Sequence, residues 1–447
     1  MSQIPTDHKP DNTPDGARGP QWHETAARPV RAFVLHPDIH LHGHKARRLP
    51  EPALAEAVSL TAALPGIEIC GTEVVSLPRL HPGMYFGSGK LAELKERFEA
   101  DQISLVLINS QISPVQQRNL ERFWQVKLLD RTGLILEIFG ERAQTREGVL
   151  QVELAALEYQ RSRLVRAWTH LERQRGGFGF VGGPGETQME ADRRMIDEQT
   201  VRLRRQLDRV VRTRELHREA RAKVPFPIVA LVGYTNSGKS TLFNRLTGAE
   251  VLARDMLFAT LDPTMRGMIL PSGQKVILSD TVGFISDLPT QLVAAFRATL
   301  EEVLSADLIV HVRDISHPET AEQAADVTEI LDSLGVSDTT PRLEIWNKLD
   351  LVPESGRQAL RSQVHARNDA FAISALTGEG VDELLAALSA TLDEGRRQEE
   401  IRLPFTQGRR RAWLHEHGVV RSEDVDQSEW VLNVSWTRWQ RESWKIL

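Results

Sequence analysis

The apolar positions of this chain follow two spacings, which predict strands and helices in alternation over its first third. Short β-branched runs predict strands at 32–36, 68–76, 103–109 and 126–129. Helical periodicity predicts helices at 52–64, 90–100 and 113–124. This alternation favours a small α/β domain with a largely parallel sheet at 30–145. The first 29 residues are rich in Pro, Asp and Gly without periodicity, and we expect a disordered tail there.

A longer helical periodicity follows on both sides of a glycine-rich string at 176–185. The apolar positions are Leu150, Leu154, Leu157, Leu164, Trp168 and Leu171, then Ile196, Leu203, Leu207 and Val210. We expect an antiparallel helical hairpin over 146–224 with a glycine-rich tip. Its polar faces are rich in arginine with glutamates interspersed, which by itself fits a salt-bridged, solvent-exposed surface.

The tip of this hairpin is the part best suited to a partner. A GxGxxG-like string is typical of a dinucleotide site only after a strand, and here a helix precedes it. A tip with free backbone, aromatic side chains and flanking arginines suits a groove of structured RNA. The candidate RNA-binding residues are Arg173, Arg175, Gly176, Gly177, Phe178, Phe180, Arg193 and Arg194.

The pattern over 225–394 predicts a doubly wound α/β domain. Strand-like runs lie at 228–232, 266–270, 275–279, 308–313, 342–346 and 370–373. Helices are expected near Lys239, Gln291, Glu319, Gly356 and Gly380. The remaining 395–447 carry a basic run, an acidic run and a strand-like stretch at 430–439, and we expect a small α+β module whose tryptophans lie in its core.

Composition narrows the class of protein. A chain of 447 residues should form two or three domains, and its 26% of charged residues is ordinary for a globular protein. The net charge of −6 means that any surface for nucleic acid must be local. Cys70 is the only cysteine, which excludes disulfide frameworks and multi-cysteine zinc sites. No apolar run is long enough to span a membrane, and a cytoplasmic location is expected. The histidines at 36, 40, 42 and 44 fit either a metal tract or a solvated loop.

The main chemical motif lies between a predicted strand and a predicted helix. It consists of Gly233, Tyr234, Thr235, Asn236, Ser237, Gly238, Lys239, Ser240 and Thr241. In this context a GxxxxGK[ST] pattern predicts a phosphate-binding loop, because its backbone N–H groups and the helix N-terminus converge on the phosphates. Lys239 would reach the β- and γ-phosphates, and the Ser240 hydroxyl would bind Mg²⁺.

Two further segments would respond to the γ-phosphate. The first is Asp280, Thr281, Val282 and Gly283, where the aspartate can hold Mg²⁺ through water and the glycine N–H can bond the γ-phosphate. The second runs through Phe258, Ala259, Thr260, Leu261, Asp262, Pro263 and Thr264. A threonine there would be the second protein ligand of the metal, and spacing alone leaves both Thr260 and Thr264 open.

A third group of residues predicts guanine as the base. The group is Asn347, Lys348, Leu349 and Asp350, followed after the next strand by Ser374, Ala375 and Leu376. The Asp350 carboxylate can accept hydrogen bonds from N1–H and the 2-amino group of guanine, which adenine does not offer. Lys348 would lie over the base, and a main-chain N–H of the second segment would bond O6. The sequence thus predicts a GTP-binding enzyme with Mg²⁺.

The order of these motifs (GYTNSGKS, FATLDPT, DTVGF, NKLD, SAL) resembles that of the translation-factor-related GTPases. Together with GGPGETQME after the arginine-bearing helix, the chain from about residue 30 onward resembles the HflX family of ribosome-associated GTPases. The resemblance implies binding to the large ribosomal subunit, with the tip near the peptidyl-transferase region, and splitting of stalled ribosomes under stress. It favours Thr260 as the metal ligand. The chain departs from the family at Gly182-Gly183, where relatives often carry an arginine.

Hydrolysis should be slow without a partner. Many GTPases place a glutamine directly after the glycine that corresponds to Gly283, where it orients the attacking water, but here the residue is Phe284. By resemblance, Asn236 stands where some relatives hold an activating K⁺. We expect a monomer.

Two other functions remain open on the residues. One is a signalling GTPase with a protein partner and the hairpin as a docking arm. The other is an RNA-remodelling NTPase with a second ATP site at Gly87-Ser88-Gly89-Lys90, which lacks the full phosphate-loop spacing.

Overall fold

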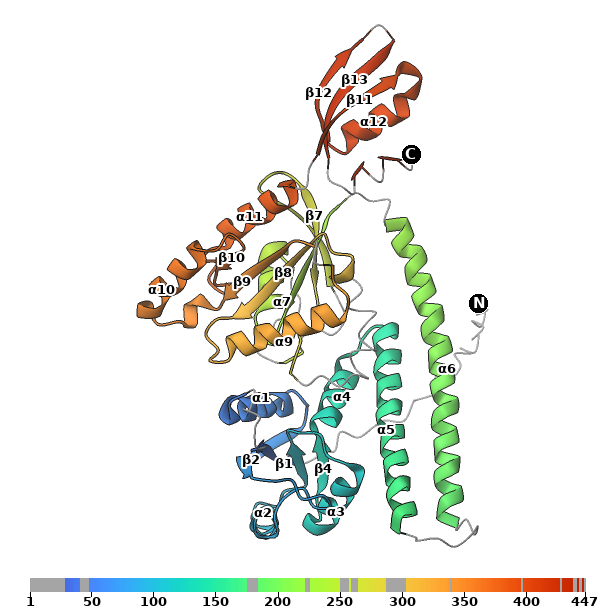
Figure 1. Cartoon of the computed structure of the whole chain (residues 1–447), viewed down its shortest axis with the longest axis vertical. Coiled ribbons are helices and arrows are strands. Elements are labelled where there is room, and N and C mark those ends of the chain that lie inside the picture. Colours follow the sequence, from blue (N-terminus) through green and yellow to red (C-terminus); the bar gives the residue numbers. More distant parts are fainter. Residues whose placement is uncertain are drawn as a thin grey trace, which may run out of the picture.

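The computed structural model contains three β-sheets arranged along the long axis of the molecule (Figure 1). It describes residues 29–40, 48–174, 184–221, 226–249, 257–258, 264–286, 303–337, 340–394, 397–426, 428–436, 440–441 and 444–445. The predicted tail therefore lies outside the described residues except for its last position. None of the described helices is long and apolar enough to cross a membrane.

The first sheet is fully parallel, with strand order β2-β1-β3-β4. Its strands are β1 (Val30–Ile39), β2 (Ile67–Leu77), β3 (Leu105–Ile108) and β4 (Lys127–Asp130), and its first helices are α1 (Pro50–Ala62), α2 (Ser88–Ala100) and α3 (Pro114–Trp124). Alternate side chains of β1 enter two cores, since Phe33 and Leu35 pack on α2 and α3 while Ala32 and Val34 face α1. The predicted α/β architecture is confirmed.

One helix of this region was not predicted from the sequence. It is α4 (Arg131–Arg142), which follows β4 directly, with Asp130 as its N-cap accepting from the Gly133 N–H. Its residues from Arg131 to Leu136 are all buried, and the exposed residues are Glu137, Gly140 and Glu141 in its second half. A polar face this narrow is easily overlooked in the sequence.

The predicted hairpin consists of α5 (Arg146–Gln174) and α6 (Pro184–Arg221), which lie side by side (Figure 1). Leu150, Leu157 and Leu203 are buried in the seam between the two helices. Glu158 pairs with Arg204 and Arg161 with Asp197, so the helices run antiparallel. Residues 175–183, most of the predicted tip, lie outside the described residues.

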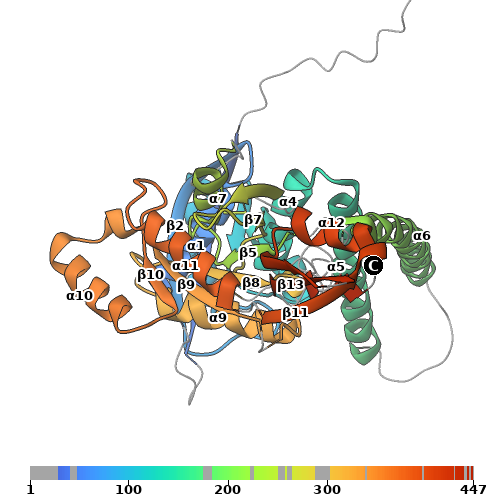
Figure 2. The ribbon, with the colours of Figure 1, turned by 90° about the horizontal axis from the view of Figure 1, so that it is seen from above.

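The second sheet has the order β10-β9-β8-β5-β7-β6, with only β6 antiparallel to its neighbour. The strands are β5 (Ile228–Gly233), β6 (Thr264–Ile269), β7 (Lys275–Asp280), β8 (Leu308–Asp314), β9 (Arg342–Asn347) and β10 (Ala370–Ala372). The helices are α7 (Lys239–Thr247), α9 (Thr320–Ser333), α10 (Glu354–His365) and α11 (Val381–Glu394). Helices α7 and α9 lie on opposite faces of β5 and β8, as a doubly wound sheet requires (Figure 2). The helix predicted near Gln291 falls outside the described residues.

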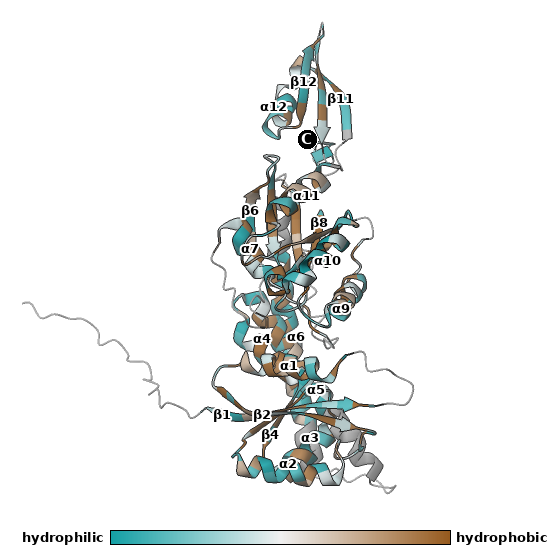
Figure 3. Cartoon of the chain, turned by 90° about the vertical axis from the view of Figure 1, so that its left-hand side faces the viewer, coloured by the Kyte–Doolittle hydropathy of each residue, from teal (hydrophilic) through white to brown (hydrophobic). Residues whose placement is uncertain are grey.

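The third sheet is antiparallel, with order β11-β13-β12. It comprises β11 (Arg397–Pro404), β12 (Val420–Val425) and β13 (Glu429–Trp436), with the 3₁₀ turn η2 (Phe405–Gln407) and α12 (Gly408–Glu416) between β11 and β12. Trp436 and Trp444 are buried in its core, in agreement with the predicted role of the tryptophans. Strands β11 and β12 were not predicted, because the RQEEI stretch of the first and the RSED stretch of the second are almost entirely polar. In Figure 3, hydrophilic and hydrophobic residues share the strands of this module.

The early histidines do not form a metal site within the described residues. His36 Nδ1 lies 3.0 Å from the Asn109 side-chain nitrogen, and His40 pairs with Asp38. No group of three potential metal ligands among His, Cys, Asp and Glu occurs in the described part of the chain. His42 and His44 lie outside it.

His311 on β8 should make stability depend on pH. Burial is the main reason that the pKa of His311 is lowered to about 4, while Glu344 opposes the shift and Arg313 adds to it. The unfolded chain takes up a proton below about pH 6.5, and the folded chain does so only near pH 4. Acidification from pH 7 to 5 is therefore expected to cost about 2 kcal/mol of unfolding free energy through this group.

Urea denaturation of His311→Gln at both pH values checks this expectation. Between pH 7 and pH 5 the variant should lose about 2 kcal/mol less of its unfolding free energy than the parent does. His365→Gln, at an exposed position on α10, is the matched control and should lose as much as the parent. An equal pH dependence in all three proteins would contradict the assignment.

Candidate nucleotide site

The predicted phosphate loop joins β5 to α7, and its glycines permit close packing. Gly238 is the N-cap of α7 with φ +92°, and a Cβ there would lie 2.2 Å from Asn347 Nδ2. A Cβ on Gly233 would lie 2.2 Å from the carbonyl oxygen of Val312 on β8. Any larger side chain at either position would force the loop away from the strand ends.

Lys239, the first residue of α7, is buried inside the loop. Its Nζ donates to the carbonyl oxygens of Gly233 and Tyr234, at 3.1 and 2.8 Å. Burial lowers the pKa of Lys239 to about 8, although Asp280 acts in the opposite direction. A desolvated ammonium at a helix N-terminus favours an anion as its partner, so phosphate oxygens fit this position.

The predicted metal-binding pair lies beside the lysine. Ser240 Oγ donates to Asp280 Oδ2 at 2.7 Å, where β7 ends. A hydroxyl and a carboxylate are the hard oxygen donors that Mg²⁺ prefers, so these residues fit the ion. Thr260 lies outside the described residues. Thr264 begins β6, where it is paired with Asp280 in the sheet. The choice of Thr260 therefore stays a prediction.

The segment that follows Asp280 packs directly against the phosphate loop. A Cβ on Gly283 would lie 2.8 Å from the Thr235 side chain and 3.1 Å from Lys239 Nζ. Phe284 exchanges backbone hydrogen bonds with the loop, because its N–H donates to Gly233 O and its carbonyl accepts from the Thr235 N–H. The Phe284 side chain is buried in an apolar cluster, so it has no means of orienting water.

The residues predicted to bind guanine converge from two strand ends. Asn347 Nδ2 donates to Ser237 O at 2.8 Å, and Asn347 Oδ1 accepts from the Ala375 N–H at 2.9 Å. Ser374 Oγ donates to Asp350 Oδ1 at 2.5 Å, which orients the carboxylate expected to read the base. Asn347 thus ties the phosphate loop to the base-binding loop.

Two residues that the sequence did not single out hold this base site. Arg245 on α7 donates from Nε to Ala375 O and from Nη2 to Leu376 O, at 2.6 and 2.5 Å. Asp314, at the end of β8, pairs with Lys348 at 2.9 Å. Both fix backbone or side-chain positions beside the predicted base contacts. No motif marks them, since each acts through its place in the fold.

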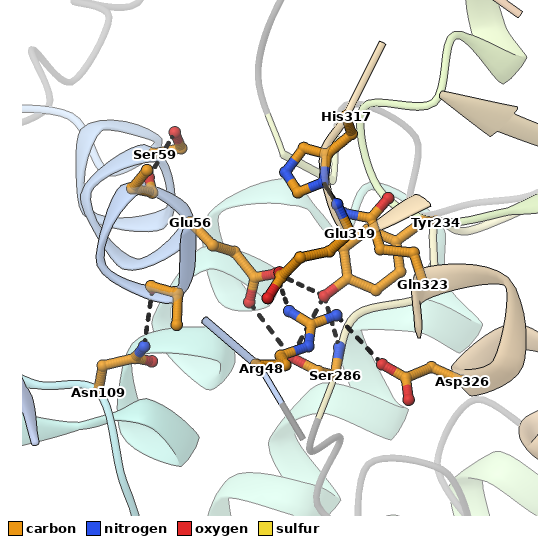
Figure 4. A network of polar contacts seen from close by, with 12 residues as sticks. Arg48, Glu56, Ser59, Asn109, Tyr234, Ser286, His317, Glu319, Gln323 and Asp326 are labelled. Atoms are coloured by element: carbon orange, nitrogen blue, oxygen red, sulfur yellow. Dashed lines mark hydrogen bonds and ion pairs between the residues drawn. The ribbon is translucent and has the colours of Figure 1, made fainter. Parts of the chain in front are cut away.

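A larger omission is a network between the first sheet and the nucleotide site (Figure 4). Glu56 of α1 accepts from Arg48, from Arg131 of α4 and from the Tyr234 hydroxyl. Burial acts to raise the pKa of Glu56, but the neighbouring arginines Arg131 and Arg48 bring it below its ordinary value. Ser286, six residues after Asp280, completes the network. The sequence offered one signal, since Arg131 stands just before an apolar stretch. The structure buries it almost fully, and a buried arginine needs an anionic partner.

The residues predicted to bind K⁺, RNA or a second nucleotide differ in their exposure and in their partners. Asn236 is exposed, with φ +58°. Arg193 and Arg194 are exposed on α6 and pair with Asp197 and Glu190 on the same helix. The other RNA-binding candidates lie outside the described residues or, for Arg173, have an undescribed side chain. At the alternative ATP site, the Lys90 ammonium already pairs with Glu73 and Glu93.

Family models match four consecutive parts of the chain. Residues 51–140 match the GTP-binding GTPase N-terminal model and 142–221 the GTP-binding GTPase middle region. Residues 228–348 match the 50S ribosome-binding GTPase model and 359–444 the HflX C-terminal domain. A solved structure, the SsGBP and GDP complex, is 26% identical with a TM-score of 0.46, covering 80% of this chain and 98% of that one.

Two curated relatives span most of the chain. The GTPase HflX of Magnetococcus marinus is 50% identical over 397 residues, which cover 89% of this chain and 90% of the relative. The GTPase HflX of Escherichia coli is 43% identical, covering 84% and 87%. These matches run through both the arginine-rich hairpin and the nucleotide loops described above, and the chain belongs to the HflX family of GTPases.

Proposed function

We propose that this GTPase uses GTP to control its association with the large ribosomal subunit and that it separates stalled ribosomes. The observation that carries the proposal is the joining, in one chain, of a guanine-nucleotide site to a basic helical hairpin. The match of 228–348 to the 50S ribosome-binding GTPase model supports the choice of partner. A signalling GTPase would need the same nucleotide site but no basic arm.

The exposed face of α6 carries charge suited to RNA. Arg202, Arg205 and Arg212 are spaced so that they share one face of the helix, and all are exposed. Within the described residues none of these three arginines has an acidic partner, unlike Arg193 and Arg194. Unpaired guanidinium groups can bind phosphates without first breaking an ion pair.

Sedimentation with separated ribosomal subunits tests the association. The protein should pellet with the large subunit when loaded with a non-hydrolysable GTP analogue, and much less with GDP. Changing Arg202, Arg205 and Arg212 to glutamine should weaken pelleting by about tenfold or more and reduce its salt dependence. The matched control replaces Arg161 and Arg204, which already pair with Asp197 and Glu158, and it should pellet like the parent. Failure to pellet with any nucleotide would refute the proposal.

Binding of GTP, rather than its hydrolysis, would separate the subunits in this scheme. The analogue should therefore support separation, and hydrolysis would serve to release the protein. Ser240 and Asp280 would hold Mg²⁺, which supplies charge neutralisation at the β- and γ-phosphates when bound. A requirement for hydrolysable GTP in subunit separation would show that this order of events is wrong.

Intrinsic hydrolysis should be slow, because the buried Phe284 side chain leaves the attacking water without a side-chain partner at that position. We propose that Asn236, which is exposed within the phosphate loop, helps to bind an activating K⁺. Turnover should then be faster in potassium than in sodium buffer at equal ionic strength. Equal rates in both buffers would eliminate the potassium site.

A further inference from the structure

The nucleotide site is in contact with the first domain through a cluster of buried polar groups. Arg131 Nη2 donates to Glu56 at 2.5 Å, to Ser286 O at 2.9 Å and to Ser286 Oγ at 3.0 Å. The Tyr234 hydroxyl donates to Glu56 and accepts from the Ser286 N–H at 2.8 Å. Arg48 bridges Glu56 to Asp326 of α9. We call Arg48, Glu56, Arg131, Tyr234 and Ser286 the latch.

The charged side chains of the latch are buried, which strengthens their hydrogen bonds while the two domains are in contact. The side chains of Arg131 and Glu56 are only 6% and 10% exposed, and that of Arg48 is 14% exposed. Charge-assisted hydrogen bonds in such a poorly hydrated place are stronger than those at the surface, and a broken one leaves a buried charge unpaired. The arrangement therefore favours either the whole contact or its complete separation.

The latch holds the segments of the nucleotide site that respond to a γ-phosphate. Tyr234 is the second residue of the phosphate loop, and Ser286 lies three residues after Gly283. Beside the latch, Phe139 of α4 packs edge-to-face on Phe258, with ring centroids 4.6 Å apart. Phe258 lies two residues before Thr260. One face of the first domain thus touches the phosphate loop at Tyr234, the segment that leads to Thr260 at Phe258, and the backbone just after Gly283 at Ser286.

The position of Gly283 shows why a γ-phosphate would act on this contact. A Cβ on Gly283 would lie 3.1 Å from Lys239 Nζ, so Gly283 and the lysine are nearly in contact. A diphosphate requires only that the lysine side chain turn toward it. A γ-phosphate bonded by both Lys239 and the Gly283 N–H needs space that this contact does not leave, so we expect its binding to move Gly283. Ser286 is carried by the same short stretch of backbone.

We propose that the latch clamps the first domain onto the GTPase domain and that the γ-phosphate of GTP opens it by displacing the Gly283–Ser286 segment. Latch closure then opposes the binding of GTP but not of GDP, and GTP in turn loosens the first domain. Thermodynamic linkage requires these two effects to be equal in size. The inference rests on GTP binding by this site and is independent of any ribosomal partner.

Glu56→Gln tests the latch through the ratio of two affinities. The variant weakens both arginine contacts without touching the nucleotide. It should bind a non-hydrolysable GTP analogue about tenfold more tightly than the parent, within the usual range of allosteric couplings, and bind GDP with unchanged affinity. A general loss of structure would lower both affinities and could not produce this split. An unchanged analogue affinity, or one that falls with that of GDP, would overturn the proposal.

The matched control is Glu73→Gln. Glu73 pairs with Lys90 and Arg97 on the far side of the same domain, so this change also breaks a carboxylate pair with two cations. Neither nucleotide affinity should change in this variant. Because no ribosome is present in the measurement, failure of the ribosomal proposal leaves its outcome unaffected.

Hydrogen exchange gives a second test, which uses the parent protein and so does not depend on whether a variant folds. The Leu49 N–H donates to Glu319 Oε1 at 2.6 Å, across the contact between the two domains. Its exchange should be faster with the GTP analogue than with GDP, whereas the Gly133 N–H, bonded to Asp130 within the first domain, should not respond. Equal protection of Leu49 in both nucleotide states would overturn the latch.

Discussion

Asp350→Asn is expected to lower the affinity for GTP and GDP by about 100-fold. The substitution leaves one amide oxygen that can accept from N1–H, but it removes the charge and the second acceptor and turns an N–H toward the 2-amino group, losses that together are worth about 3 kcal/mol. The amide that replaces the carboxylate would instead offer an N–H, which matches the 2-oxo group of xanthine. Xanthosine nucleotides should therefore bind more tightly to the variant than to the parent.

Competition against a fluorescent nucleotide measures both changes. Asp382→Asn is the control, since Asp382 is exposed on the first turn of α11, away from the base loops. It should bind guanine nucleotides like the parent. Asp350→Asn that retains parental GTP affinity would contradict the base assignment, whereas loss of all nucleotide binding would point to a structural role for the Ser374 contact.

Gly238→Ala is expected to abolish tight nucleotide binding, whereas Gly248→Ala should not affect it. Both glycines flank α7 with positive φ, +92° at the N-cap and +64° at the C-cap. A methyl group at 248 meets nothing within 4 Å, but one at 238 would lie 2.2 Å from Asn347 Nδ2. Only the first change displaces the side chain that joins the phosphate loop to the base loop.

The pair separates backbone strain from local collision. Gly248→Ala should cost about 1–2 kcal/mol of stability, the penalty of a left-handed residue, with unchanged GDP affinity. Gly238→Ala adds the collision, and its GDP affinity should fall by about 100-fold or more, as expected when several buried contacts are lost together. Titration calorimetry with GDP and thermal unfolding provide the two readouts. Equal effects of the two substitutions would show that the collision is relieved elsewhere.

The sequence predicted the fold well where an element stands out by its apolar residues. Strand β1 is an apolar run buried on both faces, the hairpin helices have regular apolar periods, and the phosphate loop has its own spacing. Helix α4 was missed because its polar face is narrow, and β11 and β12 because they are largely charged. These failures follow from reading apolar patterns, which report burial and not secondary structure itself.

The sequence predicted the residues of the nucleotide motifs but not those that join the nucleotide site to the first domain. The roles of Lys239, Asp280 and Asp350 could be predicted from motif spacing, since the first begins a helix after a glycine-rich loop and the other two lie at or just after a strand end. Glu56 and Arg131 could not, because their role depends on which domain lies against which. A buried arginine in an apolar stretch indicates that an acidic partner exists, but the partner 75 residues away has no sequence mark.

The residue before Arg131 gives the contact between the domains a mechanical consequence. Asp130 accepts from Arg163 and Tyr159 of α5 and so holds the hairpin, while the next residue, Arg131, holds the GTPase domain through Ser286. Helix α5 has 29 residues and is therefore about 43 Å long. Asp130 meets this helix at Tyr159 and Arg163, so the part from Arg163 to Gln174, roughly 17 Å long, extends beyond the contact, and a tilt of about 10° there would carry its end by roughly 3 Å. The arm would then work as a lever with its fulcrum at Asp130–Arg131, turning a displacement of ångström size beside the phosphates into a stroke large enough to engage or leave a binding surface.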